Sequence, residues 1–377
     1  MKNYFLYIAV LSLLFAGCKE EYDFPLRSSD VSLMVVEGNL NVGNDSTNIT
    51  LSRSMKLDEI VQFKPILQAQ VLVEGKDNSV STLTEKGGGN YYSSGLGMAV
   101  GNEYRLRIKT PDGKEYLSDW VLARSTPEID TIKWERLPNG ISFSSSTQDP
   151  TNNTRYYKWE YEETWQINSY FTSDFKWVGD ANIVYTPAQD LPNTCWKYDR
   201  SRTIMIGSSA QYAQDVISDL PLYFIAENNE KLGVRYSVLL KQYALSKQAY
   251  EYLNLMKKNT ETLGSIFDPL PSEMRGNISN VNDPSEIVIG YVNASAETRK
   301  RIFVTSIEAN WGYPYPIPCN YFLIANHPDS IRKYIPLYLP WAAEEPVPGV
   351  ITDYYVAPPV CVDCTLRGGN TARPNYW

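Results

Sequence analysis

The stretch Tyr236-Ser-Val-Leu-Leu-Lys-Gln-Tyr243 reads as an apolar strand, and the pattern around it decides the fold. A second apolar strand, Ile287-Val-Ile-Gly-Tyr-Val292, follows some forty residues later. Between them Ser246 is a good N-cap, because its hydroxyl can accept a hydrogen bond from an unpaired N–H group of the first helical turn. Apolar side chains then recur at three- and four-residue spacing, at Ala249, Tyr252, Leu253, Met256 and Leu263. We therefore predict an amphipathic helix over residues 246–263, ended by Gly264, that packs against a β-sheet.

Short strands are predicted over most of the remaining chain. The clearest covers residues 156–167, where Tyr157, Trp159 and Trp165 share one face while Glu160 and Glu162 fall on the other. Alternation, or short apolar runs bounded by turn residues, indicates further strands at 32–40, 46–53, 70–74, 91–92, 104–108, 115–117, 130–134, 203–206, 222–225, 234–240, 301–304 and 321–324. This pattern predicts a mainly β protein.

A division into two β-sandwich-like domains is predicted near Ser125-Thr-Pro-Glu-Ile129, where Pro127 interrupts the preceding strand pattern. Residues 30–126 carry short, regularly spaced strands, which favours an immunoglobulin-like or transthyretin-like sandwich. Residues 127–377 are expected to form a larger β-domain, with the helix lying on it and a cysteine-containing C-terminal tail.

The N-terminus carries export signals rather than fold. Residues 1–17 have a short positive start and an apolar run too short to span a membrane stably, which indicates a signal peptide. Phe15-Ala-Gly-Cys18 resembles a bacterial lipobox, which implies cleavage before Cys18 and lipid chains on that residue; several acyl chains give stable anchoring. Lys19, Glu20 and Glu21 then resemble the surface-export signal of Bacteroidota lipoproteins and begin a tether over residues 18–29. We therefore expect a lipid-anchored outer-membrane protein that faces the cell exterior.

Charge narrows the classes of partner. The chain has 35 basic and 43 acidic residues, and removal of Lys2 with the signal peptide leaves 34 basic ones and a net charge of −9. A nucleic-acid partner would need a basic face, and binding to an anionic surface by charge alone is equally disfavoured. No later stretch is long and apolar enough to cross a bilayer.

Four cysteines remain after Cys18: Cys195, Cys319, Cys361 and Cys364. An exported protein favours disulfides, and four cysteines allow three pairings that sequence cannot decide. We use Cys195 with Cys319, and Cys361 with Cys364, as a working assignment. A redox or zinc role for the Cys-x-x-Cys pair is disfavoured, because no second pair is present and His327 is the only histidine.

Residues that could carry catalysis are few. Glu160, Glu162 and Glu163 could offer a carboxylate pair for glycoside hydrolysis, but the first two lie on the polar face of their strand, where solvated charge explains them. His327 precedes Pro328 in a turn-like run, so a surface loop is the better interpretation. No catalytic motif, metal site or cofactor is predicted, and we expect a non-enzymatic protein.

Two proline- and aromatic-rich loops are the more suggestive feature: Trp311-Gly-Tyr-Pro-Tyr-Pro-Ile-Pro-Cys319 and Tyr334-Ile-Pro-Leu-Tyr-Leu-Pro-Trp341. Prolines stiffen such loops, and the rings offer stacking area to a protein, sugar or peptide. The candidate face consists of Trp311, Tyr313, Tyr315, Tyr338 and Trp341. The alternative is that these rings cap the sandwich core.

Several motifs together resemble the Bacteroidota lipoprotein family known as domain of unknown function 4249. They are Cys195-Trp196, Ser246-x-x-x-Tyr250, Gly264-Ser-Ile-Phe-Asp-Pro269, Gly276-Asn-Ile278, Gly290-Tyr291, Arg299-x-Arg301 and the tail from Cys361 to Trp377. The resemblance brings no catalytic residues with it. It implies genes beside TonB-dependent outer-membrane transporters, and hence a non-enzymatic accessory that helps such a transporter to capture its substrate. A stand-alone surface glycan- or peptide-binding protein, or adhesin, is the alternative.

Overall fold

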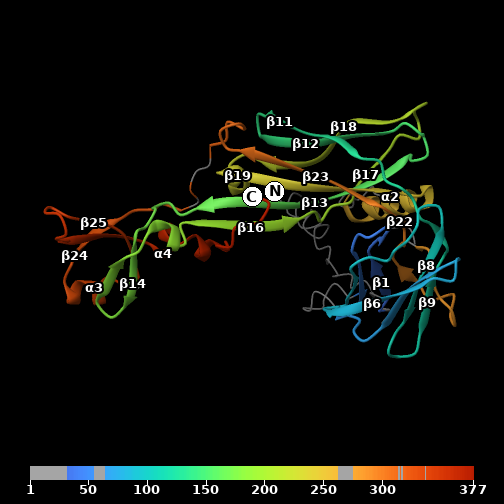
Figure 1. The fold of residues 1–377 in the computed structure, drawn as a ribbon, viewed down its shortest axis with the longest axis horizontal. Helices are drawn as coiled ribbons and strands as arrows, with labels where there is room; N and C mark the ends of the chain where they lie inside the picture. The colour runs from blue at the N-terminus through green and yellow to red at the C-terminus, as the bar shows by residue number, and fades with distance from the viewer. Residues whose placement is uncertain (1–31, 55–63, 262–274, 313–314, 316, 336) are drawn as a thin grey trace, which may run out of the picture. The chain divides into compact units, whose positions relative to one another are not determined.

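The computed structural model describes residues 32–54, 64–261, 275–312, 315, 317–335 and 337–377 (Figure 1). Strands dominate these ranges and form several sheets, which confirms the predicted mainly β, sandwich-like fold. Residues Leu33–Trp377 make up one compact unit. Within the described ranges, no helix combines the length and hydropathy needed to cross a bilayer.

The first sheet carries most of the N-terminal strands. Its order is β20 (Ile278–Asn280), β9 (Glu115–Ser118), β8 (Glu103–Lys109), β5 (Gln70–Gly75), β6 (Val80–Gly87), β7 (Asn90–Ser93), β3 (Thr47–Arg53), β1 (Met34–Glu37) and β21 (Val288–Ile289), with β10 (Val121–Leu122) on β8 and β4 (Lys64–Pro65) on β3. Every second side chain along a strand points into the core of this sheet, as in β8, where Tyr104, Leu106 and Ile108 are buried. Strands along the whole order share one hydrophobic core, so the sheet folds over itself as a sandwich does.

Strands from residues 278–295 pair with N-terminal strands, although sequence alone placed them with the second domain. β21 pairs in parallel with β1 and β20 pairs with β9 in the first sheet, while β22 (Ala294–Ser295) and β2 (Leu40–Asn41) form a separate two-stranded sheet. The apolar run 287–292 gave no sign of its pairing partner, because a parallel partner can lie anywhere in the sequence. The predicted boundary near residue 126 is therefore crossed by backbone pairing.

Two glycines, Gly276 and Gly290, make this return possible. A Cβ atom on Gly276 would lie 1.5 Å from the carbonyl oxygen of Gly290, and one on Gly290 would lie 2.2 Å from the carbonyl oxygen of Val36. Gly290 also has a φ of +142°, a region that side chains with a Cβ rarely adopt. Neither position therefore has room for a side chain, and Gly264, which was predicted to end the helix, lies outside the described residues.

The next two sheets face each other across a second core. One consists of β11 (Ile129–Leu137), β12 (Gly140–Asp149) and β18 (Asp215–Ala226); the other has the order β16 (Thr194–Arg200), β13 (Tyr156–Asn168), β19 (Arg235–Ala244) and β23 (Glu297–Thr305), with β17 (Met205–Ser208) on β13. Phe143 from one sheet and Tyr236 from the other belong to the same buried cluster. Tyr157, Trp159 and Trp165 point inward from β13, as the alternation predicted.

The C-terminal residues cover the outer face of the sheet that contains β13 and β23, which we call the second sheet. The Tyr376 hydroxyl lies 2.7 Å from the Thr164 hydroxyl, and the Arg301 guanidinium lies 3.6 Å from the Tyr376 ring centroid. Trp377 packs edge-on against Phe303, with ring centroids 5.7 Å apart. Thr164 is consequently buried, although it lies on the polar face of β13.

Smaller elements lie between the central strands in the chain and after them. They are the hairpin β14 (Phe175–Gly179) and β15 (Asn182–Tyr185), the sheet β24 (Phe322–Ala325), β26 (Asp353–Ala357) and β25 (Leu339–Glu344), the helices α3 (Pro328–Tyr334) and α4 (Pro359–Val362), and the 3-10 turns η1 (Ala188–Asp190), η2 (Glu230–Leu232) and η3 (Cys364–Arg367). His327 is the exposed N-cap of α3, where its Nδ1 accepts from the Asp329 N–H.

The predicted helix is α2 (Lys247–Glu261). Its N-cap prediction is confirmed, because the Ser246 hydroxyl accepts a hydrogen bond from the Ala249 N–H at 3.0 Å. On its buried face the Tyr252 hydroxyl accepts from the Gly290 N–H at 2.8 Å, which ties the helix to the returning strand. The predicted end near Leu263 lies outside the described residues.

Candidate binding site

Six aromatic side chains form a connected series of ring contacts in space. We call them the ring row: Tyr315, Tyr170, Phe171, Trp341, Tyr321 and Tyr355. Tyr315 meets Tyr170 edge to face at 5.0 Å between centroids, and Phe171 stacks on Trp341 at 4.4 Å. The contacts Tyr170–Phe171, Phe171–Tyr321, Trp341–Tyr355 and Tyr321–Tyr355 connect the rest. Tyr170 and Tyr321 are each 53% exposed, so the row offers ring surface to solvent.

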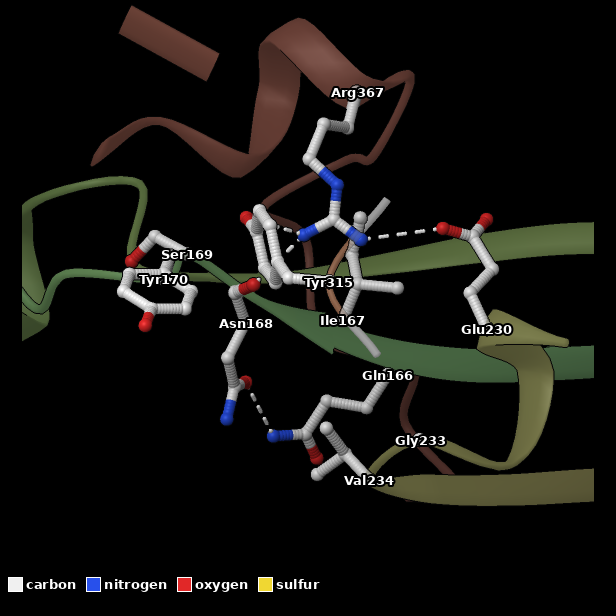
Figure 2. Close-up of a pocket in the computed structure, with 10 residues that line it drawn as sticks. All are labelled: Gln166, Ile167, Asn168, Ser169, Tyr170, Glu230, Gly233, Val234, Tyr315 and Arg367. Carbon is white, nitrogen blue, oxygen red and sulfur yellow. Dashed lines mark hydrogen bonds and ion pairs between the residues drawn. The ribbon is translucent and has the colours of Figure 1, made fainter. Parts of the chain in front are cut away.

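A cavity of about 300 Å³ opens at the Tyr315 end of the ring row (Figure 2). The end of β13 supplies one wall, η2 and the two residues between it and β19 supply another, and η3 supplies Arg367. The lining residues are Gln166, Ile167, Asn168, Ser169, Tyr170, Glu230, Gly233, Val234, Tyr315 and Arg367. Its size is at the lower end of the range for small-molecule sites, which suits a compact ligand or one unit of a longer one.

Arg367 organises the cavity. Its side chain is 8% exposed, and its Nη1 donates to the Asn168 carbonyl oxygen at 2.9 Å and to the Tyr315 hydroxyl at 2.7 Å. Its Nη2 donates to Glu230 at 3.2 Å, and its guanidinium lies 4.5 Å from the Tyr315 ring centroid (Figure 2). A planar group with several donors can hold three partners at once, so Arg367 fixes a strand end, a loop and a 3-10 turn together.

Glu230 is the matching acceptor. It also accepts from the Lys197 ammonium group and, at 3.3 Å, from the Trp165 indole. Burial alone would raise the pKa of Glu230, but the hydrogen bond and charge of Lys197 and the charge of Arg367 outweigh it and hold that pKa below its usual value. Glu230 is therefore ionised at neutral pH and is already engaged by cations of the protein.

Both disulfides hold the walls of this cavity. Cys195 pairs with Cys364, and Cys319 pairs with Cys361. The expectation that all four cysteines form disulfides is confirmed, but the working pairing was wrong. η3 places Cys364 beside β16, where Cys195 lies, and α4 places Cys361 near the loop that carries Cys319. Arg367 lies three residues after Cys364, and Tyr315 lies four residues before Cys319, so each bond anchors one of these side chains.

The predicted candidate face is divided between surface and core. Trp311 is buried, and its indole donates to the Asn229 carbonyl oxygen at 3.0 Å, so it caps the core. Tyr315 lines the cavity, and Trp341 belongs to the ring row. Tyr338 is half-buried with its ring 4.8 Å from that of Phe322, and Tyr313 lies outside the described residues.

Sequence reasoning missed most residues of this site, among them Asn168, Tyr170, Phe171 and Arg367. The paired rings of Tyr170 and Phe171, directly after a long half-buried strand, were a usable signal. Arg367 carried none on its own, because its role depends on the disulfide that brings the tail to β16 and β13.

The carboxylates considered for hydrolysis do not converge. Glu163 is 2% exposed on the inner face of β13, where it accepts from the Tyr236 hydroxyl at 2.8 Å and pairs with Lys231. Glu160 and Glu162 belong to the opposite face and pair with Lys158 and Lys241. Burial raises the pKa of Glu160, but the charge and hydrogen bond of Lys158, the charge of Lys241 and the hydrogen bond from Tyr243 together outweigh it, and the net direction is downward. These three groups are structural ion pairs of one strand.

The lipidation site Cys18 and the export residues Lys19, Glu20 and Glu21 lie outside the described residues. Their roles remain predictions from the sequence.

Among solved structures, the chain is similar to chitinase ChiA74 from Bacillus thuringiensis, with 12% identity and a TM-score of 0.16 over 53% of this chain and 29% of that one. It is also similar to a putative carbohydrate binding protein from Bacteroides uniformis, with 10% identity and a TM-score of 0.13 over 57% of this chain and 91% of that one. Scores this low support no inference about fold or function.

No curated protein has a significant match to the sequence. A family model does match, over residues 19–301, which is most of the chain. The cavity residues Tyr315 and Arg367 and three of the four paired cysteines lie beyond the matched range. The chain belongs to the family described as Domain of unknown function (DUF4249).

Proposed function

We propose that this protein is a surface-exposed outer-membrane lipoprotein that serves, without catalysis, as an accessory of a TonB-dependent transporter and helps it to capture its substrate. The observation that carries the proposal is the partly exposed ring row beside a preformed cavity. Aromatic residues are enriched where proteins bind partners, because large rigid rings supply contact area at low entropic cost.

The sequence supports the location. The lipobox ending at Cys18 supplies a lipid anchor, and Lys19, Glu20 and Glu21 supply an export signal to the outer face. The transporter itself is implied by the family resemblance. The ring row gives such a partner a surface on one side, while the cavity at its end keeps a separate place for a ligand.

Affinity purification from the outer membrane tests the proposal. The C-terminus is a poor place for a tag, because Trp377 packs on the second sheet; the exposed turn at Pro138 and Asn139, between β11 and β12, is better. After gentle solubilisation we expect one TonB-dependent barrel to co-purify in a fixed ratio. Recovery of the lipoprotein alone, under conditions that keep other barrel–lipoprotein pairs intact, would contradict the proposal.

A matched pair of variants locates the contact. Tyr321→Ala removes an exposed ring of the ring row away from the cavity, whereas Tyr212→Ala removes a similarly exposed ring, 57% against 53%, that has no place in the row. We expect barrel recovery to fall with Tyr321→Ala and to stay unchanged with Tyr212→Ala. Equal recovery from both would exclude the ring row as the docking surface.

The second candidate is a stand-alone surface glycan- or peptide-binding protein. The observation that favours it is the cavity itself, which needs no partner chain to be complete. Ligand binding at full affinity by cells that lack the transporter would favour this alternative.

A further inference from the structure

We propose that the cavity under Arg367 is a binding subsite for one neutral pyranose unit of an oligosaccharide, with the Tyr170 ring as its stacking surface. This deepens the capture role proposed above by naming the ligand class, and it rests on that role only for its biological purpose. The chemistry of the cavity carries the assignment in four steps.

The first step is charge. The cavity holds a cation and an anion, but they are bound to each other: Arg367 donates to Glu230, and Lys197 donates to the same carboxylate. Arg367 gives its other bonds to the Asn168 carbonyl oxygen and the Tyr315 hydroxyl. An anionic ligand would have to compete with Glu230 for these donors and would bring its own desolvation cost. The walls therefore favour an uncharged ligand.

The second step is the pair of rings. Tyr170 and Tyr315 meet at an interplanar angle of 75°, so they form a corner at one end of the cavity. The Arg367 guanidinium covers part of the Tyr315 ring, whereas Tyr170 is 53% exposed. A flat, accessible ring of this kind binds a ligand with an apolar face, which a pyranose presents with its axial C–H groups.

The third step is the pattern of hydrogen-bonding groups. The Gln166 amide donates to the Asn168 side-chain oxygen at 3.0 Å, which orients both amides along the wall opposite Arg367 (Figure 2). An amide is both a donor and an acceptor, as a sugar hydroxyl is, so the two groups match without any charge. A peptide would instead need an open strand edge or a deeper apolar pocket for its side chains.

The fourth step is rigidity. The Cys195–Cys364 bond anchors η3, which carries Arg367, and the Cys319–Cys361 bond anchors the loop after Tyr315. Gly369 lies against this anchor, since a Cβ atom there would come 2.5 Å from the Cys195 Cβ. Walls fixed before the ligand arrives avoid the entropic cost of ordering them on binding.

Calorimetric titration of the full-length protein tests the assignment. The protein is purified without a transporter in an amine-oxide detergent, since a sugar detergent could occupy the site. The probes are the neutral hexasaccharides of cellulose, starch, laminarin, mannan and xylan, with hexagalacturonic acid as the anionic probe and a random hexapeptide mixture as the peptide probe. We expect at least one neutral hexasaccharide to bind, and neither the acid nor the peptides to do so.

Variants then place the ligand. Tyr170→Ala should weaken binding about fivefold, since a stacked ring contributes on the order of 1 kcal/mol, while Tyr170→Phe keeps the ring and the affinity within roughly twofold. Asn168→Ala removes the amide but leaves the carbonyl oxygen that Arg367 uses, and should cost roughly three- to tenfold. Tyr212→Ala is the surface control and should change nothing.

The assignment is overturned if no neutral hexasaccharide binds, if only the acid or the peptides bind, or if Tyr170→Ala binds as the wild type does. Because the titration contains no transporter, its failure leaves barrel co-purification untouched, and the Tyr321→Ala experiment can fail while this titration succeeds.

Discussion

The N-terminal sheet and the C-terminal segment 312–377 keep their shapes by different means. The sheet, completed by β20 and β21, buries a continuous core of aliphatic and aromatic residues and closes through backbone contacts at Gly276 and Gly290. The C-terminal segment has shorter strands, smaller buried clusters and aromatic rings that remain partly exposed. Three of the four cysteines paired in the structure lie in this segment.

This difference indicates where binding is built. The N-terminal sheet is stabilised by its full core, whereas a segment that leaves its rings exposed has less apolar burial to stabilise it. Covalent bonds replace that burial and at the same time fix Arg367 and Tyr315. Each of the following predictions changes either the packing of buried residues or the disulfides and contacts of the C-terminal segment.

The largest loss of stability is expected from Gly276→Ala, which disrupts close backbone packing in the N-terminal sheet. The new Cβ would lie 1.5 Å from a backbone oxygen, which cannot move without displacing β21 from β1. We expect a loss of more than about 5 kcal/mol in the free energy of unfolding, enough to prevent folding. Urea unfolding followed by circular dichroism measures it. Gly312→Ala, where no heavy atom lies within 4 Å, is the matched control and should be neutral.

Removal of a disulfide should come next. The double variant Cys195→Ser with Cys364→Ser opens a loop of 169 residues, and Cys319→Ser with Cys361→Ser opens one of 42. Chain entropy predicts losses of about 5 and about 4 kcal/mol, so the first should be the larger by about 1 kcal/mol. The urea midpoints of the two double variants, compared with wild type, check this order. Equal stability of wild type and both variants would show that burial alone holds the segment.

The sequence predicted the N-terminal sheet well and the C-terminal segment poorly, for a physical reason. In strands such as β8, apolar and polar residues alternate, so Tyr104, Leu106 and Ile108 could be assigned to the buried face from sequence alone. β12 was missed, because its run of serines weakens the apolar signal even though Ile141 and Phe143 are buried. The site was harder still to predict. Arg367 reaches Asn168 because a disulfide holds the tail there, and the spacing of the cysteines does not reveal which of them pair.

A smaller effect is expected from Trp377→Ala, which removes the tail from the second sheet. The Trp377 ring packs against Phe303 and Trp196 and lies 5.2 Å from the Arg235 guanidinium. Because this ring is only partly buried, we expect a loss of about 1–2 kcal/mol, below that of a core tryptophan. Thermal unfolding measures it. Trp377→Phe should recover about half of the loss, and an unchanged melting temperature in Trp377→Ala would mean that the tail contributes no packing energy.

The smallest effect concerns pH and returns to the N-terminal sheet. Glu286 accepts from Lys114 and Tyr116 at 2.9 Å and from Asn280 at 2.6 Å, and so joins β9 to the loop before β21. Burial raises its pKa, but these bonds outweigh it and lower the pKa below the usual 4.5. A carboxyl whose pKa is lower in the folded state stabilises the fold above pH 4.5 and loses this contribution as pH falls through the folded value. Glu286→Gln should therefore cost about 1 kcal/mol at pH 7 and progressively less below pH 4.5.

Urea unfolding of Glu286→Gln at pH 7 and at several values below 4.5 measures this convergence. Glu345→Gln, at an exposed position after β25, should track the wild type at every pH. A difference between Glu286→Gln and wild type that stayed constant down to pH 3 would mean that the carboxylate charge contributes nothing and that the contact is purely steric. In that case backbone closure at Gly276 and Gly290 would hold the returning strand without electrostatic help.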